Sequence, residues 1–224
     1  MDATSLETRT FMSKVYGWMS AGLVVTAGVA MYASSNAKLM EVVFGNPILF
    51  FGLIILQLGL VVVLSAAIKK ISANTALLLF LLYAALTGLT FSAIFLVYTA
   101  ASIGSTFLIT AGTFGAMSMY GYVTKTDLTT VGNIAFMGLI GIILASLVNI
   151  FWPNGTLYWI ITYIGILVFV ALTAYDTQKI KRMNIIGNAG TDEDKKESII
   201  GALTLYLDFI NLFLLLLRIF GRRR

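Results

Sequence analysis

The sequence predicts an all-α, polytopic membrane protein with seven transmembrane helices. Of its 224 residues, 59% are hydrophobic and only 11% are charged, whereas soluble domains carry about 25% charged residues. The apolar residues gather in stretches of about 20, the length that an α-helix needs to cross a bilayer. The links between these stretches leave no room for a soluble domain, so we expect a single transmembrane domain over residues 1–224.

The predicted spans follow a polar N-terminal segment, residues 1–14. No signal-peptide cleavage site follows the first apolar run of the sequence. We therefore expect the first helix to act as the targeting signal. The spans are expected at residues 15–34, 47–68, 75–98, 102–123, 131–151, 157–178 and 199–220. Six of these helices could form two layers of three around the seventh, which is polar for a membrane span.

Turn-forming residues separate several of the spans. Asn46-Pro47 opens the second, Lys125-Thr126-Asp127 separates the fourth from the fifth, and Trp152-Pro153-Asn154-Gly155 separates the fifth from the sixth. The link over residues 179–198 is the long one. Its mixture of basic and acidic residues predicts a solvated, charged loop.

The basic residues predict the orientation, because lysine and arginine concentrate in cytoplasmic loops. A cytoplasmic N-terminus leaves only Lys38 in the external loops and places on the inside Arg9, Lys14, Lys69, Lys70, Lys125, Lys179, Lys181, Arg182, Lys195 and Lys196. After seven crossings, however, the tail Arg222-Arg223-Arg224 lies outside. Either the tail is tolerated there, or the last segment is re-entrant and returns inside.

Small residues at a spacing of four favour close packing between membrane helices. Gly17 with Ala21, and Gly112 with Ala116, form such pairs. We expect close helix contacts at these positions.

The chain contains no cysteine and no histidine. Disulfides, thiol chemistry, a Ser-His triad and a zinc or haem site with histidine or cysteine ligands are therefore excluded. Carboxylates remain as the acid/base groups that could titrate near neutrality. We expect no enzyme activity, no cofactor and no nucleic-acid partner; the lipid bilayer is the environment of the protein.

Two acidic residues fall inside the predicted spans. Of the ten acids in the chain, eight lie in predicted loops or termini: Asp2, Glu7, Glu41, Asp127, Asp192, Glu193, Asp194 and Glu197. Asp176 lies close to the cytoplasmic end of the sixth span, and Asp208 lies nearer the middle of the seventh. A charge in the hydrocarbon core costs several kcal/mol, so Asp208 must be protonated, paired or hydrated.

Asp208 belongs to a polar stripe on the seventh span. Thr204 precedes it by four residues and Asn211 follows it by three, which places all three on one helix face. This face should point into the bundle. Asp176 lies about two residues inside its span and Asp208 about nine, a difference in depth near 10 Å at about 1.5 Å per residue, so the spacing permits contact between the two carboxyl groups without requiring it.

If the two carboxyl groups meet, they cannot easily both ionise, and they would share a proton. Such a pair would act as a pH-sensing latch. Carboxylate oxygens are also natural ligands for calcium, so Asp176 and Asp208 are the candidate metal ligands. The alternative is structural: Asp208 as a neutral clasp that hydrogen-bonds to neighbouring helices, and Asp176 as an ordinary charge at a helix end.

Other polar residues in the spans give weaker signals. Gln57 and Asn149 are more often clasps between helices than pore ligands. Arg218 lies about 15 Å from Asp208 along the helix, too far for an ion pair, and we expect it to snorkel to the interface. Tyr206 and Trp159 fit packing or interfacial belts.

Two motifs resemble a known family. AYDTQKIKR at residues 174–182 and ALTLYLDFINLFLLLLRIFG at residues 202–221 resemble the transmembrane Bax inhibitor motif family (Bax inhibitor-1-like), in its bacterial form. The similarity extends over essentially the whole chain. It implies a seven-helix fold with a central last helix, in a bacterial inner membrane, that acts as a proton-sensitive calcium leak.

The resemblance also implies roles for individual residues. The aspartates that form a hydrogen-bonded pair in the family match Asp176 and Asp208. The basic residue that latches this pair in related bacterial proteins aligns with Ile68, so the next residues, Lys69 and Lys70, are the expected substitutes. An acidic residue that some relatives carry in the second helix aligns with Gln57, which would weaken the attraction for cations at the far side of a pore.

Three functions from different classes follow. The first is a pH-sensitive calcium leak channel gated by Asp176 and Asp208, with Asn211, Thr204 and Gln57 as candidate pore-lining residues and with calcium ions and protons as partners. The second is a membrane interaction protein that regulates a membrane protease or a stress pathway without transport and binds other membrane proteins. The third, an intramembrane protease, is disfavoured, because histidine is absent and Asp176 lacks a glycine-rich context.

Overall fold

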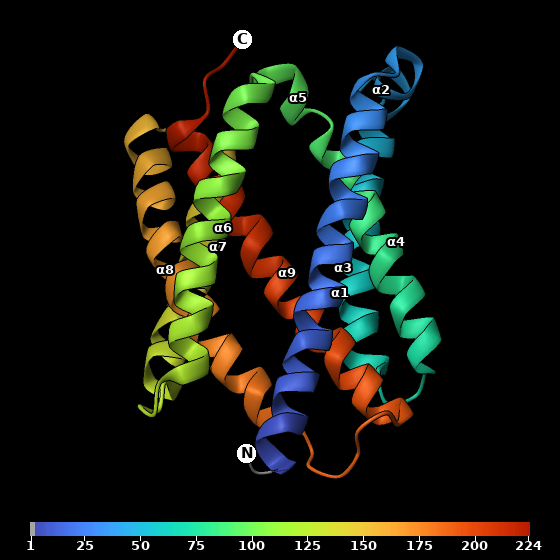
Figure 1. Cartoon of the computed structure of the whole chain (residues 1–224). Coiled ribbons are helices and arrows are strands. Elements are labelled where there is room, and N and C mark those ends of the chain that lie inside the picture. Colours follow the sequence, from blue (N-terminus) through green and yellow to red (C-terminus); the bar gives the residue numbers. More distant parts are fainter. Residues whose placement is uncertain (1–2) are drawn as a thin grey trace. The chain divides into compact units, whose positions relative to one another are not determined.

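The computed structural model describes residues 3–224, and these residues are helical without a strand (Figure 1). The terminal acid Asp2 lies outside the described residues. The helices are α1 (Ala3–Ser34), α2 (Ala37–Phe44), α3 (Pro47–Ala67), α4 (Ala73–Phe91), α5 (Ile94–Val97), α6 (Ala100–Val123), α7 (Thr129–Phe151), α8 (Gly155–Met183) and α9 (Asp192–Phe220).

The prediction of an all-α protein with seven membrane spans is confirmed. Seven helical segments of the described chain are long and apolar enough to cross a bilayer: α1, α3, α4 together with α5, α6, α7, α8 and α9. The short helix α2 contains Glu41, which we had assigned to a loop. Polar side chains begin several of the helices, because the first backbone N–H groups of a helix need acceptors.

The turn-forming residues act as predicted. The side chain of Asn46 accepts hydrogen bonds from the N–H groups of Ile48 and Leu49, with Pro47 at the start of α3. The Oδ1 atom of Asn154 accepts from the N–H of Leu157 in the first turn of α8. These caps explain why the helices begin where they do.

The chain divides into two compact units. Unit 1 takes the described residues up to Thr99 together with Met183–Tyr206 and Arg223–Arg224, and unit 2 takes Ala100–Arg182 and Leu207–Arg222. The helix α9 contributes its first half to unit 1 and its second half to unit 2. The single domain over residues 1–224 stays a prediction.

Unit 1 is built on the contact between α1 and α4, which lie side by side (Figure 1). Tyr206 of α9 is fully buried beside them, with its hydroxyl 2.6 Å from Oγ1 of Thr26. Its ring packs edge to face on Phe80 and Tyr83. Tyr206 therefore belongs to the core and not to an interfacial belt.

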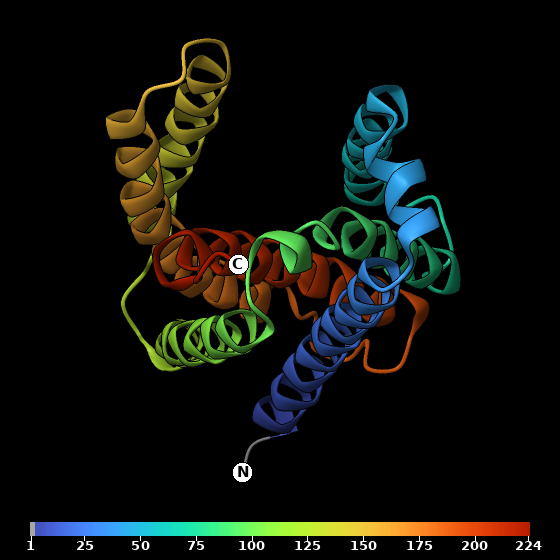
Figure 2. The same ribbon diagram turned by 90° about the horizontal axis from the view of Figure 1, so that it is seen from above.

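Unit 2 is built on α6, α7, α8 and the second half of α9. Figure 2 shows α7 and the first half of α8 side by side, joined by the short link at residues 152–154. Rings from α6 and α9 pack together: Phe107 and Phe114 lie 5.3 and 5.5 Å from Phe209 between ring centroids. Phe209 directly follows Asp208 in the sequence, so this aromatic cluster lies beside the aspartate motif of α9.

The close helix contacts do not lie where the small-residue spacing predicted them. No atom of another helix lies within 4 Å of a Cβ built at Gly17 or Gly112, so that prediction is wrong. Such contacts occur at Gly88, against Thr26 and Val29, and at Gly121, against the backbone of Ala174. Spacing along one helix does not reveal which face meets a neighbour, and this explains the error.

The predicted solvated loop over residues 179–198 is also wrong in part. The helix α8 continues to Met183 and α9 begins at Asp192, which leaves a connector over residues 184–191. The acids from Asp192 to Glu197 thus lie in the first turns of α9, where negative charge is favourable near a helix N-terminus.

The last segment is one unbroken helix. α9 has 29 residues, or roughly 43 Å at 1.5 Å per residue, which is enough to cross a bilayer. Its continuity favours a full crossing over a re-entrant loop, with Arg222-Arg223-Arg224 at the opposite end from Asp192. The side of the membrane on which each terminus lies stays a prediction.

The contact between α1 and α4 predicts opposite effects of alanine at two glycines. A Cβ at Gly88 would lie 2.6 Å from the carbonyl oxygen of Thr26, so we expect Gly88→Ala to lower the free energy of unfolding by about 1–3 kcal/mol through overpacking. Gly28→Ala, where nothing lies within 4 Å, should be neutral or stabilising, because alanine is the better helix former. Thermal unfolding of both variants in detergent tests this, and equal melting temperatures would contradict it.

Candidate functional site

Asp176 is held in place by the residues that follow it in α8. The hydroxyl of Thr177 lies 2.9 Å from that of Ser118 in α6. The buried side chain of Gln178 accepts a hydrogen bond from the N–H of Leu128 and donates one to the carbonyl of Thr126, at 2.9 and 2.8 Å. These bonds fix α8 against α6 and against the α6–α7 link.

The basic end of the same motif makes further anchors. Lys181 donates to the carbonyl oxygen of Tyr122 at 2.8 Å, and its Nζ lies 4.7 Å from the centre of the Tyr122 ring. Arg182 pairs with the exposed Asp127 at 3.3 Å. Hydrogen bonds from the hydroxyl and N–H of Thr129 hold the pKa of Asp127 below its usual range. The motif that carries Asp176 is thus a rigid connection between three helices.

The close approach of α6 and α7 to α8 depends on two glycines. Gly121 lies against the backbone of Ala174, and Gly132 lies against the ring of Tyr175. A side chain at either position would push α8 away from its neighbour. The residues on both sides of Asp176 are therefore fixed, which leaves the carboxyl group a defined position.

Asp208 lies in the apolar half of α9 that belongs to unit 2. Only 5% of its surface is exposed. Phe209 and Leu212, next to it and one turn further along the helix, are buried as well. Water can satisfy little of this carboxyl group, so its partners must come from the protein or from a ligand.

The carboxyl groups of Asp176 and Asp208 are hydrogen-bonded to each other. The contact that the spacing only permitted is therefore present. Our depth estimate treated both helices as upright, whereas Figure 1 shows α9 at a slant to α6. A hydrogen bond between two carboxyl groups needs a proton on one of them. Among the described residues, no group hydrogen-bonds to Oδ2 of Asp208.

The two polar neighbours of Asp208 bond to their own helix. Thr204 donates to the carbonyl of Ile200 at 3.0 Å, and Asn211 donates to that of Leu207 at 2.8 Å. Both residues are half-buried, so the stripe does not share the full burial of Asp208. Their pore-lining role stays a prediction.

Gln57 acts as the expected clasp between helices. Its Nε2 donates to the hydroxyl of Thr90 at 2.8 Å, which joins α3 to α4 in unit 1. Asn149 does not: its Oδ1 accepts from the N–H of Asn154 in the adjacent link. Arg218 lies over the ring of Tyr158, 5.0 Å from its centre.

The candidate latch residues lie in unit 1. Lys69 and Lys70 are exposed after the end of α3. Lys69 lines a cavity of about 410 Å³ together with Lys196, Glu193 and Glu197. A latch function for either lysine stays a prediction.

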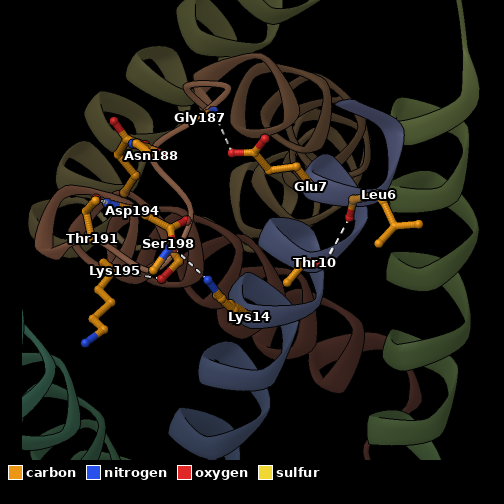
Figure 3. A network of polar contacts seen from close by, with 12 residues as sticks. Leu6, Glu7, Thr10, Lys14, Gly187, Asn188, Thr191, Asp194, Lys195 and Ser198 are labelled. Atoms are coloured by element: carbon orange, nitrogen blue, oxygen red, sulfur yellow. Dashed lines mark hydrogen bonds and ion pairs between the residues drawn. The ribbon is translucent and has the colours of Figure 1, made fainter. Parts of the chain in front are cut away.

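A second polar cluster, which the sequence did not reveal, fixes the connector between the two aspartate-bearing helices (Figure 3). Lys14 of α1 pairs with Asp194 at 2.6 Å; the Asp194 side chain is 2% exposed. The same carboxylate accepts from the N–H of Gly190, and Glu7 accepts from the N–H of Gly187, both at 2.8 Å.

The two glycines of this connector are required by the backbone. Gly187 and Gly190 have φ angles of 92° and 84°, a region that residues with a side chain rarely adopt. They form the turns that bring the connector back to α9. The acids at 192–194 are a recognisable signal of a helix start, and glycines signal a helix end or a turn, but the partner Lys14 lies 180 residues away.

Fold and site define a polytopic α-helical membrane protein with a pair of carboxyl groups inside its spans. The family described as inhibitor of apoptosis-promoting Bax1 matches residues 8–224. The inner membrane protein YbhL of Escherichia coli K12 is 62% identical over 217 residues, which cover 96% of this chain and 93% of the relative. The chain belongs to the Bax inhibitor-1 family.

More distant relatives match over nearly the same length. An uncharacterized protein of Borreliella burgdorferi is 50% identical over 214 residues, with 96% of this chain and 92% of the relative covered. A protein of Rickettsia prowazekii, also uncharacterized, is 46% identical over 219 residues, with 96% and 91% covered. The similarity therefore extends over nearly the whole chain.

The connector cluster predicts unequal roles for two neighbouring acids. Asp194→Ala leaves Lys14 without its partner and the N–H of Gly190 without its acceptor, so we expect a loss of about 2–4 kcal/mol in the free energy of unfolding. Asp192→Ala is the matched control, because the Asp192 side chain is 49% exposed in its pair with Lys196, and exposed pairs contribute little. Chemical unfolding in detergent measures both; an equal loss would contradict the assignment.

Proposed function

We propose that this protein is a pH-sensitive calcium leak channel of a bacterial inner membrane, with its N-terminus in the cytoplasm. The observation that carries the proposal is the hydrogen bond between the half-buried Asp176 and the buried Asp208, within two membrane spans. Intramembrane ionisable groups mark ion pathways and proton relays. Calcium is the transported ion, and the proposal includes neither an enzyme activity nor a cofactor.

The pair has the chemistry of a proton-controlled gate. With one proton, the two carboxyl groups attract each other through the hydrogen bond. Without it, they carry two like charges at close range in a medium of low dielectric and repel each other. A change of pH therefore switches the force between α8 and α9 from attraction to repulsion.

The small number of calcium ligands fits a conducting path better than a tight calcium-binding site. Tight calcium sites supply about six to eight oxygens, whereas a conducting path must bind the ion weakly enough to release it. Within the described residues, no group of three or more acidic side chains is placed so that it could hold a metal ion. Asp176 and Asp208 offer only two carboxyl groups.

Asp208→Asn tests the gate, because its amide donates permanently to Asp176 and imitates the singly protonated pair. We expect the variant in liposomes to show, at both pH 6 and pH 8, the calcium flux that the wild type shows at pH 6. The wild type should show different fluxes at the two pH values. The measurement is the uptake of calcium, reported by a dye inside the liposomes.

Asp127→Asn is the matched control for this experiment. Asp127 is exposed, and its lowered pKa keeps it ionised at both pH values, so the variant should retain the pH dependence of the wild type. If Asp208→Asn also retained it, the gate assignment would be wrong. Absence of flux from the folded wild type would favour the other hypothesis, a membrane interaction protein that regulates a protease or a stress response.

A further inference from the structure

The helix α6 buries a column of hydroxyl groups in unit 2. Ser102, Thr106, Thr110 and Ser118 follow one another at intervals of four or eight residues, which places them along one face. Thr106 and Thr110 are fully buried, and Ser102 and Ser118 are 6% and 4% exposed. Serine and threonine are common where membrane helices pack closely, so the column alone does not mark a site.

One member of the column lacks a hydrogen-bond partner. The hydroxyl of Thr110 donates to the carbonyl of Thr106 at 2.8 Å, and that of Ser118 lies 2.9 Å from Thr177. Among the described residues, nothing hydrogen-bonds to Oγ1 of Thr106. An unpaired hydroxyl in a fully buried position is unfavourable, and valine would fill the same volume without that penalty.

Ser102, Thr106 and Thr110 lie in the part of α6 that packs on α9 and its C-terminal end, whereas Ser118 lies against Thr177 of α8. Near the outer end of the column, Ser102 Oγ donates to the carbonyl of Arg222 at 3.4 Å. Further along α6, Phe107 lies 6.3 Å from Phe213 and Phe114 lies 5.5 Å from Phe209 between ring centroids. Residue numbers rise along α6 as they fall along α9, so the two helices are antiparallel. Thr106 and Thr110 therefore lie between the end of α9 and the level of Asp208.

We propose that the hydroxyl face of α6, formed by Ser102, Thr106 and Thr110, is the hydrated path by which calcium reaches the carboxyl pair from the C-terminal end of α9. The inference rests on the proposed cation leak and names its route. Hydroxyl oxygens are neutral, hard ligands that can replace water around calcium. The buried Oγ1 of Thr106, which has no hydrogen-bond partner among the described residues, lies on α6, and the buried Asp208 lies on α9.

The natural absence of cysteine makes the route directly testable. In Thr106→Cys, a hydrated path allows the thiol to ionise and to react with a small water-soluble cationic reagent such as a methanethiosulfonate ethylammonium. We expect this variant, in liposomes, to react roughly tenfold or more faster than a thiol kept from water. Mass spectrometry of the intact chain follows the reaction.

Two control variants set the unreactive baseline. Leu108→Cys lies two residues further along α6. The Leu108 side chain is 72% exposed on the protein surface, and in the membrane this surface contacts lipid instead of water. Thr162→Cys is fully buried in α8, at a hydroxyl that already donates to Tyr158. Ser102→Cys repeats the test at the outer end of the column if Thr106→Cys fails to fold. Equal rates for the column and the baseline variants would overturn the proposal.

Flux measurements separate this inference from the proposed function. Thr106→Val should keep the melting temperature of the wild type or raise it, and should lower the calcium flux several-fold, whereas Thr106→Ser should keep the flux. If the wild type conducts calcium but Thr106→Cys is unreactive, the ion takes another route and only this inference fails. If Thr106→Cys reacts but no variant or wild type conducts, the path is hydrated and the calcium leak itself is wrong.

Discussion

The hydrogen bond between Asp176 and Asp208 is the constraint on which unit 2 depends. Two carboxyl groups have been placed among apolar helices, where neither can be left without a partner. They can satisfy each other only if one keeps a proton and if both side chains are held at hydrogen-bond distance. The contacts around Asp176 meet the second condition: Gln178 fixes α8 to the α6–α7 link, and Gly121 lets α6 approach its backbone. These contacts hold α8 in the position at which Asp176 meets Asp208.

Hydropathy predicted the spans, and the positions of the acids singled out Asp176 and Asp208, whereas contact between the two was implied only by the family resemblance. Seven apolar stretches become seven long helices. The connector was not predicted, because a run of mixed charges reads as a solvated loop. In the structure, a helix N-terminus accepts the acids favourably, and Asp194 finds Lys14 far away in the chain. Residues this far apart in the sequence meet only in the folded chain, so the sequence pattern could not predict their ion pair.

The glycines show a second limit of the sequence. Gly112 and Gly121 lie on the same helix, and both have small or polar residues nearby. Gly112 has no neighbouring helix within 4 Å, whereas Gly121 touches the backbone of Ala174. Spacing describes one helix at a time, and the difference depends on which face meets α8. The aspartate motif was a better indicator of where the helices pack closely. Gly121 packs on Ala174 and Gly132 packs on Tyr175, and these two residues immediately precede Asp176.

The hydroxyls of α6 follow from the same energetic argument as the aspartates. Membrane helices usually satisfy threonine by a bond to the carbonyl one turn back, as Thr110 and Thr162 do. Thr106 does not. An unsatisfied atom is unfavourable in an apolar interior, so its occurrence at Thr106 is better explained by a transient ligand than by packing. A path with few charges and neutral oxygens binds calcium weakly, and weak binding is what permits the ion to leave.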